Sequence, residues 1–174
     1  MRFIIQLEHG NMAIEIKDLS LVNVHFTEER MPADGYEFRS GGEAELYKRA
    51  SQQIFEYFQG KRKVFSLPYQ LNGTEFQKMV WSELSQVQYG ETISYSELAE
   101  RCGKKSAVRA VANAVGRNTL LLLIPCHRII RKSGELGGFA EGVERKRELL
   151  RGEGIILNAK DAKGQRTQRR GWRN

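Results

Sequence analysis

The sequence predicts an α+β protein in two parts, a small strand-and-helix module at residues 1–66 and a helix-rich domain at residues 70–158. Near the amino terminus, apolar residues alternate or cluster in short runs, as they do in strands. After Pro68 and Gly73 they recur instead at helical spacing. From residue 159 onward the apolar residues are alanines and one tryptophan, so residues 159–174 are expected to be a disordered basic tail.

The first module is expected to hold three short strands and one helix. The strands are predicted at residues 3–7, 12–16 and 19–26, with a hairpin turn at residues 9–11. Residues 27–42 are polar and contain glycine and proline, which predicts a loop. Residues 43–59 predict an amphipathic helix that ends at Gly60. Its apolar face contains Leu46, Ala50, Ile54, Tyr57 and Phe58. No catalytic group of side chains is visible here, so we interpret this module as a scaffold.

The second domain opens two of its helices with capping boxes, in which Ser or Thr pairs with Glu or Gln three residues ahead. The pairs are Thr74 with Gln77 and Ser94 with Glu97. The first helix has an apolar face formed by Phe76, Val80, Trp81, Leu84 and Val87. The second, at residues 94–101, ends at Cys102 and Gly103, and a third is predicted at residues 106–115. Two short helices joined by a turn with glycine are typical of a helix-turn-helix, although helical hairpins are also common elsewhere.

The third helix carries an apolar stripe and a polar stripe. The apolar positions, spaced i, i+3, i+4 and i+7, are Val108, Val111, Ala112 and Val115. Arg109, Asn113 and Arg117 fall on another face, beside Ala110 and Ala114. Small residues let a helix backbone approach a groove closely, so this face is a candidate nucleic-acid contact.

Positive charge is concentrated in one part of the chain. The formal net charge is +7, yet residues 1–100 carry 10 basic and 15 acidic side chains. Residues 101–132 carry 8 basic side chains and none that is acidic. A local excess of cations suits a surface that faces a polyanion, so the sequence favours a nucleic-acid partner.

Membrane and metal-binding functions are not indicated. The longest apolar run, residues 120–124, is far too short to span a bilayer, and no signal segment is visible at the amino terminus. We therefore expect a cytoplasmic protein whose two cysteines stay reduced. The cysteines and histidines show no paired ligand spacing, so no metal site is predicted.

Cys126 is the candidate nucleophile. It follows a predicted buried strand at residues 120–124 and stands between a proline and His127, among cations. A thiol reacts as the thiolate, and a neighbouring positive charge or imidazole lowers its pKa. Adjacent side chains on extended backbone point to opposite faces, so contact between Cys126 and His127 needs a turn or a bridging water. A catalytic histidine usually needs an orienting partner, for which Glu153 and Asn118 are the candidates.

Other interpretations fit the same residues. A sequence-specific regulator would use the helix-turn-helix and keep Cys126 as a buried thiol. A cysteine hydrolase would need an oxyanion hole, which the backbone of Gly137 and Gly138 could supply. These glycines belong to a loop expected around Phe139, before a last helix at residues 143–151. Each of the other candidates also has a non-catalytic interpretation when it is taken singly. Tyr95 could be an aromatic residue at an interface, Glu153 a solvated carboxylate at a helix end, and Asn118 a turn residue.

The motif around the cysteine resembles the active-site signature of the 6-O-alkylguanine-DNA alkyltransferases. Residues 124–130 read Ile-Pro-Cys-His-Arg-Ile-Ile, and they follow Arg-Ala-Val at residues 109–111 and Arg-Asn at residues 117–118. The resemblance extends from about Thr74 to Ile156, while the first module is similar only in outline. It implies a ribonuclease-H-like first module and a winged-helix-like helix-turn-helix in the second domain.

The resemblance also implies an activity. An alkyl group would pass from 6-O-alkylguanine, and from 4-O-alkylthymine, in double-stranded DNA to Cys126, once and irreversibly. The protein would act as a monomer without cofactor or metal. His127 would take the thiol proton through a water while Glu153 holds the imidazole, and Asn118 would brace the active-site turn. Tyr95 would help to rotate the nucleotide outward and give a proton to the departing guanine.

The family pattern further implies a DNA surface and a base pocket. Arg109 would fill the space left by the extruded base, on a helix that enters the minor groove. The expected DNA contacts are Arg109, Tyr95, Ala110, Asn113, Arg117 and Arg128. The expected pocket is lined by Val115, Ile129, Phe139 and Ala140.

The sequence departs from the family pattern at four positions. Ala112 stands where glycine is usual, and Thr119 where proline is usual. Phe139 stands where an aromatic with a hydroxyl is common, and Glu141 where glycine or tryptophan is common. These departures bear on substrate range and rate rather than on the acceptor chemistry. Alkyltransferase-like proteins that bind lesions without repair lack the cysteine, so Cys126 argues against that version.

Overall fold

The computed structural model describes residues 1–33, 35–36 and 41–157. These residues form five α-helices, one short 3-10 helix and two small sheets, which confirms the mixed α and β fold. The chain divides into two compact units. The first comprises Met1–Asn72 and Thr119–Leu121, and the second comprises Gly73–Asn118 and, among the described residues, 122–157. The tail expected at residues 159–174 lies outside the described residues.

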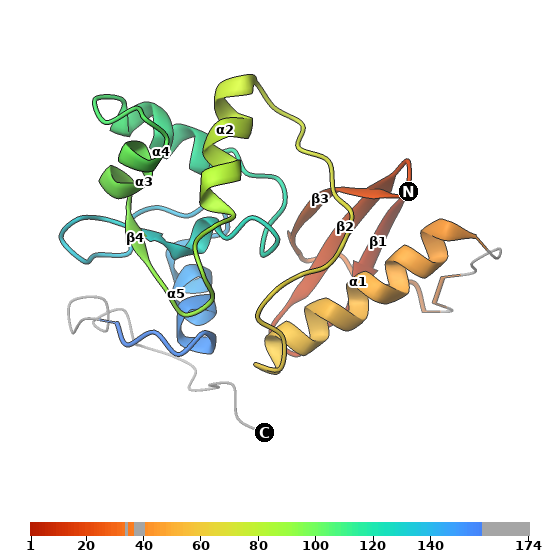
Figure 1. Ribbon diagram of the computed structural model, residues 1–174. Helices are drawn as coiled ribbons and strands as arrows, with labels where there is room; N and C mark the ends of the chain where they lie inside the picture. The colour runs from red at the N-terminus through yellow and green to blue at the C-terminus, as the bar shows by residue number, and fades with distance from the viewer. Residues whose placement is uncertain (34, 37–40, 158–174) are drawn as a thin grey trace. The chain divides into compact units, whose positions relative to one another are not determined.

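The first unit is a three-stranded antiparallel sheet accompanied by one long helix (Figure 1). The strands are β1 (Arg2–Ile5), β2 (Asn11–Lys17) and β3 (Ser20–Thr27), in that order across the sheet. The helix α1 (Gly42–Phe58) buries the apolar face that the sequence predicts. Its Tyr47 ring lies 5.0 Å from the ring of Phe3, and its Phe58 ring lies 6.2 Å from that of Phe26. Aromatic contacts therefore hold the helix against the sheet.

The prediction of a strand at residues 120–124 is wrong. Leu120 makes one isolated bridge with Val24 of β3, and the chain then turns. Leu122 takes a positive φ of 70°, which a continuous strand does not allow. Leu120, Leu122 and Ile124 are nevertheless fully buried. A short apolar run indicates that its residues are buried, but periodicity alone does not show whether they form a strand or a turn.

The second unit contains the other four helices. They are α2 (Glu75–Leu84), α3 (Tyr95–Arg101), α4 (Val108–Gly116) and α5 (Val143–Gly152). Both predicted capping boxes are present, with the Thr74 and Ser94 side chains accepting from the backbone three residues ahead. Trp81 of α2 donates its indole N–H to the carbonyl of Ala114 in α4, at 2.8 Å. Ala114 itself is buried, so the expectation that it lies beside the exposed stripe of α4 is wrong.

A two-stranded parallel sheet, which the sequence analysis did not anticipate, joins distant parts of the second unit. Its strands are β4 (Ile93–Ser94) and β5 (Ile129–Ile130). β4 runs directly into α3, and β5 follows the 3-10 helix η1 (Cys126–Arg128). The pairing therefore brings the start of α3 alongside the segment that carries the cysteine. No helix in the described residues is long and apolar enough to cross a membrane.

Candidate active site

The Cys126 thiol lies at the start of η1, inside the second unit. Residues Cys126–Arg128 form a single 3-10 turn rather than extended backbone. In such a turn, unlike in a strand, neighbouring side chains need not point to opposite faces. The Asn118 amide donates to Cys126 Sγ at 3.1 Å and to the Ile124 carbonyl at 2.8 Å. One side chain therefore holds both the sulfur and the backbone of the turn.

The environment of Cys126 favours the neutral thiol in the resting protein. The side chain is only 7% exposed. Burial raises the pKa of Cys126, and the hydrogen bond from Asn118 and the charge of Lys146 oppose that shift without overcoming it. A thiol in this state needs a base to accept its proton before it can react.

His127 is the candidate base, and it is 0% exposed. Its Nε2 lies 2.8 Å from Glu153 Oε1. Burial lowers the pKa of His127, with Arg128 and Lys146 contributing in the same direction and Glu153 opposing them. The imidazole is therefore neutral near pH 7. With Nε2–H donated to the carboxylate, Nδ1 is the ring nitrogen left to accept a proton.

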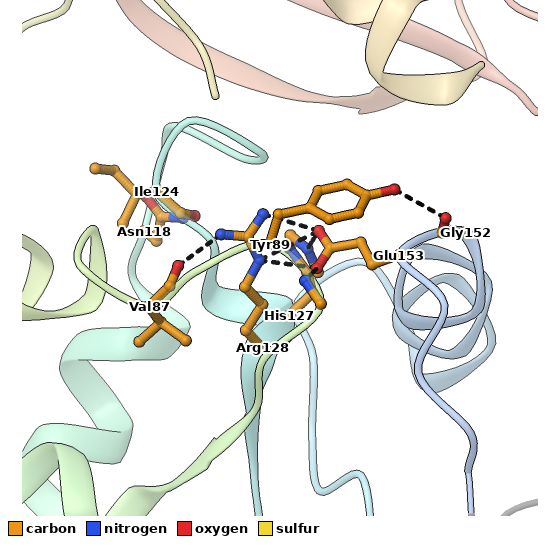
Figure 2. A network of polar contacts seen from close by, with 9 residues as sticks. Val87, Tyr89, Asn118, Ile124, His127, Arg128, Gly152 and Glu153 are labelled. Carbon is orange, nitrogen blue, oxygen red and sulfur yellow. Dashed lines mark hydrogen bonds and ion pairs between the residues drawn. The ribbon is translucent and has the colours of Figure 1, made fainter. Parts of the chain in front are cut away.

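Glu153 receives hydrogen bonds from several directions (Figure 2). The Gly90 backbone N–H donates to its Oε2 at 3.1 Å, and His127 and Arg128 engage the same carboxylate. Burial would raise the pKa of Glu153, but the bonds and charges of His127 and Arg128 outweigh it and lower that pKa to about 2. The carboxylate is therefore ionised throughout the physiological range.

Arg128 is an interior residue, which contradicts the expectation that it binds DNA. It is 5% exposed. Its Nε and Nη2 each lie 2.9 Å from a Glu153 carboxylate oxygen, and its Nη1 donates to the Val87 carbonyl at 2.7 Å. The guanidinium carbon also lies 5.8 Å from the ring centroid of Tyr89, whose hydroxyl donates to the Gly152 carbonyl at 3.0 Å. Figure 2 shows these side chains gathered around the carboxylate.

Lys146 of α5 is a buried residue of the site that the sequence analysis missed. It is 0% exposed and donates to the carbonyls of Leu136 at 2.6 Å, Gly138 at 3.5 Å and Ile129. Burial lowers the pKa of Lys146 to about 8, while interaction with Cys126 opposes that shift. One signal was available. Lys146 precedes the apolar residues Leu149 and Leu150 by three and four positions, which places it on the buried face of α5.

Tyr95 is the first residue of α3, and its ring lies close to the loop after β5. The Lys146 ammonium is 6.0 Å from the centroid of this ring. Burial, followed by the charge of Cys126, raises the pKa of Tyr95, so the phenol keeps its proton. A Cβ placed on Gly137, where φ is +71°, would lie 3.4 Å from the Tyr95 ring. The positive φ therefore favours glycine there, while the added Cβ itself would make only an ordinary contact with the ring.

The expected pocket residues differ in exposure. Val115 and Ile129 are buried, Phe139 is half-buried and Ala140 is exposed. Val115 lies in α4 and Ile129 in β5, whereas Phe139 and Ala140 lie in the loop before α5.

The predicted DNA-facing stripe of α4 lies on the surface. Arg109, Ala110, Asn113 and Arg117 are all exposed. Other cations of residues 101–132 form ion pairs with acidic residues outside that range. On the surface these pairs are Arg101 with Glu91 at 3.8 Å, Lys105 with Glu100 at 3.1 Å and Arg131 with Glu135 at 3.4 Å. The cationic surface is therefore less uniform than the count of charges alone suggests.

Comparison with known proteins places this site in a family. The DNA-binding domain of 6-O-methylguanine DNA methyltransferase, as a family model, matches residues 75–155. Over 110 residues the chain is 44% identical to a methylated-DNA–protein-cysteine methyltransferase of Methanosarcina acetivorans, a match that covers 63% of this chain and 70% of that protein. The chain belongs to the methylated-DNA–protein-cysteine methyltransferase family.

Further relatives of the methyltransferase family support this membership. The chain is 47% identical over 98 residues to an inducible methylated-DNA–protein-cysteine methyltransferase of Bacillus subtilis, which covers 56% of this chain and only 55% of that protein. A crystal structure of OGT from Mycobacterium tuberculosis, in complex with DNA, has a TM-score of 0.75 and 34% identity. That match covers 86% of this chain and 90% of the solved one, so it includes residues of both units.

Proposed function

We propose that this protein repairs DNA by direct reversal, transferring an alkyl group, such as methyl, from 6-O-alkylguanine in double-stranded DNA to its own Cys126. The observation that carries the proposal is a buried thiol held by Asn118 next to a buried His127–Glu153 pair, in a chain of this family. We extend the proposal to 4-O-alkylthymine. The thioether product is not recycled, so the protein acts once and uses no cofactor or metal.

The chemistry is a direct displacement with acid and base assistance. Cys126 gives its proton to His127 through a water, and ionised Glu153 stabilises the imidazolium. The thiolate sulfur forms a bond to the alkyl carbon, and the electrons of the broken carbon–oxygen bond stay with the guanine. Tyr95 supplies a proton to the departing guanine. The proton that His127 took from Cys126 then returns to the tyrosinate through solvent, so the net step moves one proton from the thiol to the guanine.

DNA binding in this proposal belongs to α4. Its exposed Arg109 and Asn113, with Arg117 directly after the helix, lie beside the small Ala110, which suits close approach to the minor groove. Arg109 would fill the space of the extruded base and offset part of the few kcal/mol that extrusion costs. The extruded guanine would then enter a pocket formed by Val115, Ile129, Phe139 and Ala140, with backbone groups reading its edge.

We also propose a fold type for each unit, an oligomeric state and a location in the cell. The turn between α3 and α4 supports a winged-helix-like helix-turn-helix, and the sheet with α1 supports a ribonuclease-H-like first unit. We further propose that the protein is a monomer. We also propose that it is cytoplasmic, since both cysteines are free thiols, as is usual in a reducing compartment.

Intact mass measurement tests the transfer to Cys126. With excess methylated duplex, the protein should gain one methyl group and then stop. Cys126→Ala should bind the duplex without gaining mass, and Cys102→Ala should gain one methyl as the wild type does. Methylation at Cys102, or repeated turnover, would contradict the proposal. A sequence-specific regulator would bind undamaged DNA with no mass gain, and a cysteine hydrolase would turn over an ester.

A further inference from the structure

We propose that Arg128 is a positioning residue for this reaction: its guanidinium holds the Glu153 carboxylate so that His127 rests as a neutral base. The inference rests on the proposed function. It concerns the protein before alkyl transfer, and asks which group of the buried cluster around Glu153 carries a proton.

The geometry of η1 brings two neighbouring side chains, His127 and Arg128, to one carboxylate. In the 3-10 turn, His127 Nε2 lies 2.8 Å from Glu153 Oε1 and Arg128 Nη2 lies 2.9 Å from the same oxygen. Arg128 Nε reaches the second oxygen at 2.9 Å. Extended backbone would send the two side chains to opposite faces. The turn that follows Pro125 therefore makes the shared contact possible.

Further contacts fix the guanidinium in place. Arg128 Nη1 donates to the Val87 carbonyl at 2.7 Å, and the guanidinium carbon lies 5.8 Å from the Tyr89 ring centroid. A planar fork that engages two carboxylate oxygens and a carbonyl has little freedom to move. Arg128 thus fixes the direction in which Glu153 faces His127.

Charge balance determines where the proton rests. Glu153 and Arg128 together are neutral, so Glu153 stabilises a proton on His127 less than it would without Arg128. Without Arg128, the same proton would instead neutralise a buried carboxylate. Lys146 of α5 is the other charged group that acts on His127, and Tyr89 of the segment after α2 interacts with Glu153 and Arg128. Burial is the first cause that lowers the pKa of His127, and Arg128 and Lys146 lower it further.

The consequence for the reaction is a base that is ready before the substrate arrives. A neutral His127 accepts the Cys126 proton over a wide pH range, whereas a protonated one does not. Removing the guanidinium should let the His127–Glu153 pair take up a proton at higher pH. This proton belongs to the pair, since the two groups are strongly coupled.

Two variants and two measurements test the inference. Arg128→Met removes the charge and the fork, and Arg128→Lys keeps a charge that makes fewer contacts. NMR titration of the imidazole resonances is tractable because the chain has three histidines. Single-turnover methyl transfer is followed by mass between pH 5 and pH 9. Arg62→Met, which removes an arginine paired with Glu56 in the first unit, is the matched control.

We expect the His127 titration to move to higher pH in the order wild type, Arg128→Lys, Arg128→Met. In Arg128→Met, the transfer rate at pH 6 relative to pH 8 should fall by about tenfold, the scale that one neighbouring charge imposes. Arg62→Met should leave the titration and the pH profile of transfer unchanged. If Arg128→Met does not fold, the direction of the shift in Arg128→Lys decides.

An unmoved His127 titration in a folded Arg128 variant would overturn the inference, even if the rate fell equally at every pH. That result would leave Arg128 with a structural role. Absence of methyl transfer to Cys126 in the wild type would instead contradict the proposed function, while the titration would still report on the proton position. The two failures are therefore distinguishable.

Discussion

Lys146 shows how a single buried charge shapes this site. Its ammonium donates to carbonyls before and within the loop that precedes α5, and it lies near the Tyr95 ring. It also interacts electrostatically with Cys126. Burying a charge is costly unless it is hydrogen-bonded, and carbonyl oxygens meet that need here. Because no carboxylate neutralises it directly in these bonds, its positive charge remains available to the sulfur.

We expect Lys146→Met to weaken both the fold and the thiol. Three carbonyls would lose a charged donor, so the free energy of unfolding should fall by about 3 kcal/mol. The Cys126 thiolate would lose a neighbouring cation, so alkylation of Cys126 by iodoacetamide at pH 7 should slow by several-fold.

The matched control is Lys78→Met, which removes an exposed lysine paired with Glu75. It should leave both the stability and the Cys126 reactivity almost unchanged. A Lys146→Met protein whose thiol reacts at the wild-type rate would show that the lysine supports only the loop.

Elements set by local sequence were predictable, and elements set by distant contacts were not. Thr74 and Ser94 carry their capping signals within four residues, so both helix starts follow from the sequence. The β4–β5 pair joins residues 93–94 to residues 129–130, and strands this short have no periodicity to detect. The 3-10 turn at Cys126 and the positive φ of Leu122 likewise depend on the surrounding fold.

The same distinction applies to the site. The motif around Cys126 was visible because its members lie close together in sequence, and the resemblance chose Glu153 as the partner of His127 and added Tyr95 from further away. Arg128 was expected to contact DNA from the family pattern, within the stretch of residues 101–132 that carries no acidic side chain. Its partner Glu153 lies 25 residues along the chain, and only the fold brings them together.

The exposed face of α4 is expected to act in base extrusion. Arg109→Ala should slow methyl transfer from duplex DNA by an amount equivalent to a few kcal/mol, the cost of base extrusion. It should matter far less for a free 6-O-methylguanine base, which needs no extrusion. Arg109→Lys should recover only part of the loss because a point charge does not reproduce the planar fork. Equal losses on duplex and free base would assign Arg109 to the pocket or the fold.

At the scale of the whole molecule, the second unit combines an exposed cationic helix with a buried cluster of charges. The exposed cations cost little to maintain in water, while each buried charge depends on its partner. Glu153 is the centre of that cluster, since His127, Arg128 and Gly90 all donate to it. The stability of the unit should therefore depend on pH through a small number of interior groups.

We expect the free energy of unfolding to fall in acid. The pKa of Glu153 is lowered from its ordinary 4.5 to about 2, so its contribution is complete above pH 4.5 and is lost as pH falls toward 2. That shift corresponds to about 3 kcal/mol. Burial also lowers the pKa of His127, so the unfolded chain takes up that proton first and stability starts to fall below about pH 6.5.

Urea unfolding followed by Trp81 fluorescence measures this dependence, because Trp81 is buried in the second unit. Glu153→Gln should reduce stability at pH 7 by about 3–5 kcal/mol, since it leaves Arg128 buried without its carboxylate. It should also remove most of the fall between pH 4.5 and pH 2. Glu100→Gln, which breaks the exposed pair with Lys105, should keep the wild-type profile. If Glu153→Gln retained the full loss in acid, the acid sensitivity would have to come from other carboxylates, and the buried cluster would not control the stability of this unit.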